Sequence, residues 1–200
     1  MSSCDCHIEV TDASQKGVLR KLLALNATMF VVELVVGIIG ESTGVLADSL
    51  DMLADALVYS VALYAVGRCS SVKIKAAFLS GGFQLLIALG IGTDIVRRAI
   101  TGSEPSSLLM FIVSIIALAV NAYCLKLISK EKEGEVHMRA SYIFSKNDVI
   151  ANSCVILASV IIYLTGSRWP DLIIGAIITG VVLWGGIRIL VDARQQSERD

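Results

Sequence analysis

Long apolar runs divide the chain into six similar segments separated by short polar links. About 20 apolar residues form a helix long enough to cross the hydrocarbon core of a bilayer. The runs that approach this length are residues 22–39, 43–65, 76–96, 108–127, 140–164 and 171–191. Because lipid cannot hydrogen-bond to the backbone, each run is predicted to be a helix. The pattern therefore predicts an all-α integral membrane protein with six transmembrane helices.

The composition agrees with this prediction. The 200 residues are 55% hydrophobic and 18% charged, whereas about 25% of the residues in ordinary globular domains are charged. The net charge of −1 leaves no basic excess, so no nucleic-acid partner is expected. The first 17 residues are polar and contain no apolar run before a cleavage site, so the first long run is predicted to be an anchor.

The basic residues predict the orientation. An even number of crossings puts both ends of the chain on one side, and all 17 Lys and Arg residues except Arg97, Arg98 and Arg168 fall on that side. The side richer in Lys and Arg faces the cytoplasm, so both termini are predicted to be cytoplasmic. The expected parts are a tail at residues 1–17, a six-helix membrane domain at 18–192 and a short tail at 193–200.

The second run contains three carboxylates, Asp48, Asp51 and Asp55. At 100° per residue they fall within a sector of about 60°, so one helix face holds all three. Each costs roughly 2.5 to 3.5 kcal/mol near mid-bilayer on insertion scales, which predicts a functional role. For Asp48, close to the start of the run, a position near the interface or in a cap is an equal alternative.

A second polar pair lies in the fifth run, where Asp148 and Asn152 are four residues apart and share a face. If the second and fifth helices pack side by side, four oxygen-bearing side chains converge. A divalent cation offsets the repulsion among such carboxylates, and protons replace it when it leaves. This chemistry predicts exchange of a metal ion for protons, with Asp51, Asp55, Asp148 and Asn152 as ligands.

These residues carry a resemblance to a known family. The pairs Asp51-MLA-Asp55 and Asp148-VIA-Asn152, the stretch NATMFVVELVVGIIGESTGVLADSLDMLAD and the segment WPDLIIGAIITGVVL resemble the cation diffusion facilitator family over about residues 18 to 192. The resemblance implies a six-helix divalent metal/proton antiporter with no enzymatic activity and no resident cofactor. It also implies a multi-pass protein of the membrane, with the bacterial inner membrane as the expected location.

The resemblance leaves the metal open among several ions. Zn²⁺ is the first expectation, and Cd²⁺, Fe²⁺, Co²⁺ and Mn²⁺ are related candidates. Asp51 stands where zinc exporters of the family often have His, and Asn152 stands where a second Asp is common. Four oxygen ligands favour harder ions such as Mn²⁺ or Fe²⁺.

Two further expectations concern the ends of the chain. The sequence ends about ten residues after the sixth run, so no cytoplasmic ferredoxin-like domain is expected. A homodimer, implied by the resemblance, then forms through transmembrane helices. The tail contains Cys4, Cys6 and His7, a Cys-x-Cys-His group that suits soft metals such as Zn²⁺, Cd²⁺ or Cu⁺. A plain terminus without a metal role is the alternative for this tail.

Three other acidic residues lie in or beside the apolar runs. Glu33 is predicted to face the bundle interior, either on a proton or metal path or in a structural hydrogen bond, for example to Asn26. Asp94 is predicted to pair with Arg97 or Arg98. Asp171, which follows a proline, is predicted to stabilise the start of the sixth helix.

Two other functions are alternatives to transport. An intramembrane aspartyl protease also uses two aspartates on separate helices, but here the Gly-x-Gly-Asp context is missing and the aspartates occur in spaced pairs. A membrane metal sensor or accessory protein that does not transport is the stronger alternative, because the chain is short.

Overall fold

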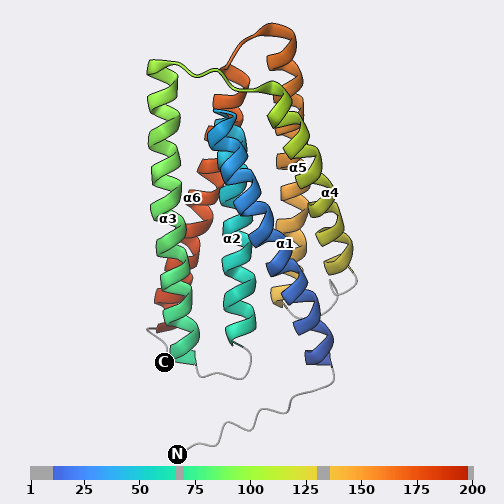
Figure 1. The fold of residues 1–200 in the computed structure, drawn as a ribbon. Coiled ribbons are helices and arrows are strands. Elements are labelled where there is room, and N and C mark those ends of the chain that lie inside the picture. Colours follow the sequence, from blue (N-terminus) through green and yellow to red (C-terminus); the bar gives the residue numbers. More distant parts are fainter. Residues whose placement is uncertain (1–10, 66–69, 130–135, 198–200) are drawn as a thin grey trace, which may run out of the picture.

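The computed structural model describes residues 11–65, 70–129 and 136–197, and they form a bundle of long helices (Figure 1). The helices are α1 (Thr11–Ile39), α2 (Thr43–Ala65), α3 (Ser70–Thr101), α4 (Ser107–Ser129), α5 (Val136–Thr165) and α6 (Trp169–Ser197). Each of the six apolar runs lies within one of these helices, which confirms the predicted all-α fold. The start of α1 and the end of α6 lie at the same end of the bundle. We call the opposite end the far end; which side of the membrane it faces stays a prediction.

Five of the helices are long and apolar enough to cross a membrane: α1, α3, α4, α5 and α6. The exception is α2, because any stretch of it long enough to span contains Asp48, Asp51 and Asp55. The chain is a multi-pass integral membrane protein. Its helices expose many large apolar side chains, as lipid-facing surfaces do, including Leu79 at 77% and Ile100 at 79%.

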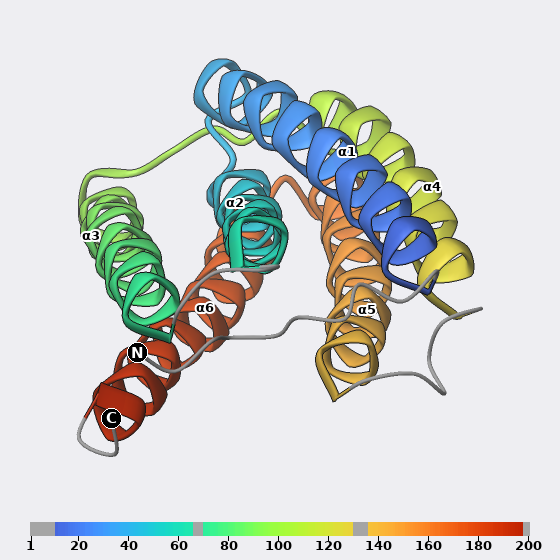
Figure 2. The same cartoon turned by 90° about the horizontal axis from the view of Figure 1, so that it is seen from below.

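The helix with the most acidic residues lies at the centre of the bundle. Among the described residues, α2 contacts each of the other five helices. Seen along the bundle, α3 and α6 pack together on one side of α2, and α1, α4 and α5 lie on the other side (Figure 2). The surrounding helices therefore separate the polar face of α2 from lipid.

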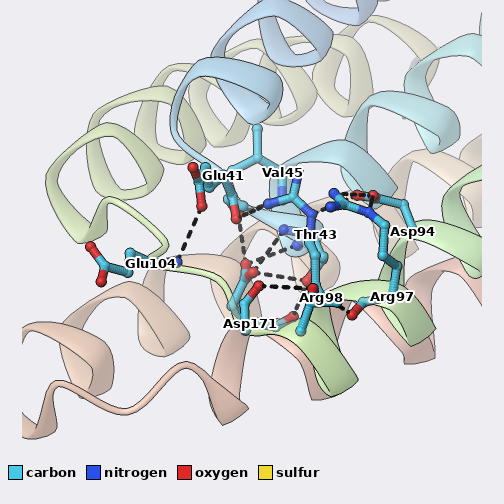
Figure 3. A network of polar contacts seen from close by, with 12 residues as sticks. Glu41, Thr43, Val45, Asp94, Arg97, Arg98, Glu104 and Asp171 are labelled. Atoms are coloured by element: carbon cyan, nitrogen blue, oxygen red, sulfur yellow. Dashed lines mark hydrogen bonds and ion pairs between the residues drawn. The ribbon is translucent and has the colours of Figure 1, made fainter.

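The start of α2 is held by a side chain from α6. The Asp171 carboxylate accepts hydrogen bonds from the Thr43 and Gly44 backbone N–H groups, at 2.7 and 2.9 Å, and from the Ser42 and Thr43 hydroxyls, at 2.6 and 2.8 Å (Figure 3). The Ser42 hydroxyl in turn accepts from the Val45 N–H. The N–H groups that the first turn of a helix leaves without helical partners are thus satisfied.

Asp171 lies in the first turn of α6, as predicted, where a carboxylate is favourable for the helix dipole. The structure adds a second role, because the same carboxylate caps α2, more than a hundred residues away in the chain. Residue spacing did not show this second role, since it carries no information about a contact between distant helices.

A second polar group at the far end joins α3 to the α1–α2 turn (Figure 3). Asp94 forms ion pairs with both Arg97 and Arg98, which confirms the predicted pairing. Arg98 also donates to the Glu41 carbonyl, and the Glu41 carboxylate accepts from the Glu104 N–H. These bonds hold Glu41 in a left-handed conformation, with φ of 50°, that residues other than glycine rarely adopt.

Close packing of α2 against α6 depends on Gly175. A Cβ atom built there would lie 2.8 Å from the Thr43 carbonyl carbon and 2.9 Å from its oxygen. Both are backbone atoms of the capped turn, so they cannot move aside alone. Elsewhere on α6, a Cβ atom at Gly180 would meet nothing within 4 Å.

We expect Gly175→Ala to lower stability by about 1 to 3 kcal/mol, because the added methyl group forces α2 and α6 apart. Gly180→Ala is the matched control on the same helix and should leave stability unchanged or slightly higher. Thermal unfolding of the detergent-purified proteins measures the difference. Equal melting temperatures for the two variants would contradict this account of the α2–α6 contact.

We expect Asp171→Asn to destabilise the protein by about 2 kcal/mol, because an amide nitrogen cannot accept the hydrogen bonds that a carboxylate oxygen accepts. Asp192→Asn, an exposed position on the same helix, is the control for the loss of one charge. The same unfolding measurement should place Asp171→Asn well below both the control and the unchanged protein.

Candidate metal centre

The predicted acidic residues of α2 point into the bundle. Asp48 is 1% exposed and Asp55 is 6% exposed, whereas Asp51 is half-buried. The burial of Asp48 removes the alternative that it lies at an interface or caps a helix, since Ser42 and Asp171 cap α2. All three aspartates are interior groups of the bundle.

Helix α5 contributes the other two predicted residues at the same depth. Asp148 is 6% exposed and Asn152 is fully buried. The Asp148 side chain is within hydrogen-bonding distance of both Asp51 and Asp55. The structure thus brings the predicted residues of α2 and α5 together. Carboxyl groups at this separation share a proton or a cation, because two bare carboxylates repel each other.

The Asn152 amide is oriented by the same group of residues. Its nitrogen donates to the Asp148 carbonyl at 2.9 Å and approaches an Asp48 carboxylate oxygen at 3.5 Å. Its oxygen is buried and accepts no hydrogen bond within the described part of the chain. An amide with its donors engaged and its oxygen free is arranged as an oxygen ligand.

Glu33 of α1 belongs to the same region. It is fully buried, and the carboxyl groups of Asp48 and Asp51 are close enough to interact with its charge. Neither of its carboxylate oxygens has a hydrogen-bond partner among the described residues. The suggested bond to Asn26 is not formed, because the Asn26 nitrogen donates to the Leu22 carbonyl of its own helix. Glu33 therefore adds another carboxylate beside the site.

Tyr59 is a neighbour that the sequence reading missed. Its hydroxyl donates to the Asp55 carboxylate at 3.0 Å. The signal was present, since Tyr59 follows Asp55 by four residues and so shares its helix face. A hydrogen bond of this kind fixes the orientation of the Asp55 carboxylate.

The carboxylates meet pairwise through Asp148. Within residues 11–65, 70–129 and 136–197, no three His, Cys, Asp or Glu side chains are arranged around one point as a closed set of metal ligands. The Cys-x-Cys-His group of the tail, Cys4, Cys6 and His7, lies outside the described residues. The role of all these residues as ligands stays a prediction.

A groove of about 290 Å³ leads to Asp51 between α5 and α6. Its walls are mostly apolar, with Ile150 and Cys154 on α5 and Ile174 and Ile178 on α6. Of the clustered aspartates, Asp51 lines this groove. Its position there explains why Asp51 is half-buried whereas Asp48, Asp55 and Asp148 are buried. The acidic group is therefore accessible at Asp51.

Known proteins and a known protein family resemble this chain over most of its length. Residues 21–196 match the family described as the cation efflux transmembrane domain. The chain is 23% identical over 193 residues to the metal cation efflux system protein CzcD of Cupriavidus metallidurans, covering 87% of this chain and 61% of that protein.

Two further relatives are similarly distant. The zinc transporter ZitB of Yersinia pseudotuberculosis is 26% identical over 183 residues, which cover 85% of this chain and 59% of ZitB. A cadmium, cobalt and zinc/H(+)-K(+) antiporter of Bacillus velezensis is 25% identical over 201 residues, which cover 94% of this chain and 64% of the antiporter. The chain thus spans about three fifths of the length of these relatives.

The groove predicts which carboxyl group reacts first with a small apolar carbodiimide. We expect dicyclohexylcarbodiimide to label Asp51 faster than Asp48 or Asp55, because Asp51 lines an apolar groove and the other two are buried. Mass spectrometry of proteolytic fragments locates the label. Preferential labelling of Asp48 would show that the acidic group is reached by another route.

Proposed function

Because the chain belongs to the cation efflux family, we propose that it moves a divalent metal ion across the membrane in exchange for protons. The family consists of transporters and not of enzymes. The observation that carries the proposal is the contact of Asp148 with both Asp51 and Asp55, beside the free oxygen of Asn152. Carboxyl groups held together in this way bind either protons or one cation.

In the proposed cycle, the metal ion leaves its hydration water for the oxygens of Asp51, Asp55, Asp148 and Asn152. Pairwise contacts become one ligand set when the ion draws α2 and α5 together. Each carboxyl group that was protonated releases its proton as it binds the metal, since a carboxylate is the ligand form. Rearrangement of the helices then opens the site to the opposite side, where protons displace the ion.

The residues around the ligand set support this cycle. Tyr59 holds the Asp55 carboxylate, and Asn152 donates toward Asp48. Asp48 and Glu33 add negative charge nearby, which attracts a cation and offers further sites for protons. We assign them to an auxiliary metal or proton path.

The substrate that we propose is Zn²⁺ or a related ion: Cd²⁺, Co²⁺, Fe²⁺ or Mn²⁺. Zinc, cadmium and cobalt appear in the names of similar proteins. The oxygen ligands of this site extend the range toward Mn²⁺ and Fe²⁺. We also propose cytoplasmic termini, a bacterial inner-membrane location and a homodimer formed through transmembrane helices.

A membrane metal sensor or accessory protein is the second candidate function. It would use the same ligands, but the bound ion would not cross the membrane. Binding alone therefore cannot separate the two functions, and the decisive observation is movement of metal and protons across a sealed membrane.

The test uses the purified protein in liposomes with a pH-sensitive dye inside and each of the five ions outside. We expect metal-dependent proton movement for a subset of the ions, and a loss of at least about tenfold to a hundredfold in Asp51→Ala and Asp148→Ala, since even residues that only orient a metal ligand cost this much when they are removed. Asp192→Asn, an exposed carboxylate outside the site, should transport normally.

Two outcomes would count against the proposal. Loss of flux in Asp51→Ala with full flux in Asp55→Ala would exclude a shared site. Absence of flux for every ion, with tight metal binding retained, would favour the sensor.

A further inference from the structure

A second group of buried polar side chains lies beside the acidic site, on α1 and α4. Asn26 and Asn121 are each 1% exposed. In the described part of the chain, the Asn26 side-chain oxygen and both polar atoms of the Asn121 amide have no hydrogen-bond partner. A buried amide without partners costs roughly 1 to 3 kcal/mol, so this pair calls for an explanation.

The packing around the two amides places them at one depth. On one side, Met29 of α1, Met52 of α2 and Ala117 of α4 form an apolar cluster. On the other side, Leu22, Tyr59 and Cys124 of the same three helices belong to a second apolar cluster.

Between these two clusters, each helix contributes one polar residue: Asn26 on α1, Asp55 on α2 and Asn121 on α4. Each lies three or four residues from its neighbour in either cluster, so it shares their helix face. The Cys124 thiol is also close enough to Asp55 to interact with its charge. The three residues therefore form a polar layer between two apolar layers.

This layer shares one residue with the acidic site. Asp55 contacts Asp148 and also lies at the depth of the two amides. Along α2, Asp55 is one turn farther than Asp51 from the far end of the bundle. An ion that reached Asp55 from the end holding the start of α1 would meet the amides before it met Asp51.

We propose that Asn26, Asn121 and Asp55 form a second, weaker site for the divalent cation, which the ion occupies on its way to or from the acidic site. The inference rests on the proposed function. Amide and carboxylate oxygens are ligands for hard divalent cations, which keep part of their water shell in such sites. With one carboxylate instead of three, the layer binds less tightly, and weak successive sites let an ion move on.

The test counts Mn²⁺ bound to the full-length protein in detergent by electron paramagnetic resonance. Mn²⁺ is chosen because it prefers oxygen ligands and so binds poorly to the Cys-x-Cys-His tail. When both sites are filled, the two ions share the Asp55 carboxylate, one on each oxygen. We therefore expect two classes of site, and Asn121→Leu should remove the weaker class, lowering the bound metal from about two ions per chain to about one. Asn26→Leu should act in the same way.

Two further variants make the result specific. Thr179→Val removes another buried hydroxyl that lacks a partner in the described residues, on α6 and outside the polar layer; it should leave both classes unchanged. Asn121→Asp adds a carboxylate and should tighten the weaker class by about tenfold or more. If Asn121→Leu fails to fold, the Mn²⁺ affinity of the weaker class in Asn121→Asp tests the inference instead.

A single class of Mn²⁺ site in the unchanged protein would overturn the inference, as would two unchanged classes in both Asn121 variants. Liposome flux separates this failure from failure of the proposed function. If the unchanged protein does not transport but Asn121→Leu still loses the weaker class, the second site stands and transport is wrong. If transport is normal in Asn121→Leu at low metal concentration, the second site is not on the path.

Discussion

The central position of α2 is the constraint on which the rest of the structure depends. Its three aspartates would be unfavourable against lipid, so the other helices must surround it, and each of them does contact it. The Asp171 carboxylate fixes the start of α2 against α6. With its end held, α2 is fixed in the orientation in which Asp51 and Asp55 lie beside Asp148 of α5.

The two polar regions of the bundle differ in how completely their groups are paired. At the far end, Asp171 accepts four hydrogen bonds, and Asp94 is paired with two arginines. Deeper in the bundle, Glu33, Asn121 and Asn152 hold buried polar atoms that lack partners among the described residues. Fully paired groups stabilise a fold, whereas buried groups left without partners are retained where a ligand or proton uses them.

Much of the fold and part of the candidate site followed from periodicity. Runs of about 20 apolar residues predicted the helices, and a spacing of three or four residues placed Asp51 with Asp55 and Asp148 with Asn152 on single faces. The depth at which two helices meet is not encoded in either spacing. Their meeting at Asp148 was therefore a hypothesis until the packing of α2 and α5 was seen.

What the sequence did not reveal depends on contacts between distant helices. The cap that Asp171 provides joins α6 to α2 across more than a hundred residues. The polar layer of Asn26, Asp55 and Asn121 was also missed. A single amide in an apolar helix has no periodic signal, and its role can be inferred only from the residues packed around it. Tyr59 alone could have been found from its spacing to Asp55.

The shielding of α2 also has a consequence for how the protein is made. A helix with three aspartates at roughly 2.5 to 3.5 kcal/mol each inserts poorly by itself. The turn of three residues after Ile39 keeps α2 beside α1, which is synthesised just before it, so the two can enter the bilayer as a hairpin. Biogenesis of α2 is therefore cooperative: its stable place in the membrane is reached only as its neighbours assemble around it.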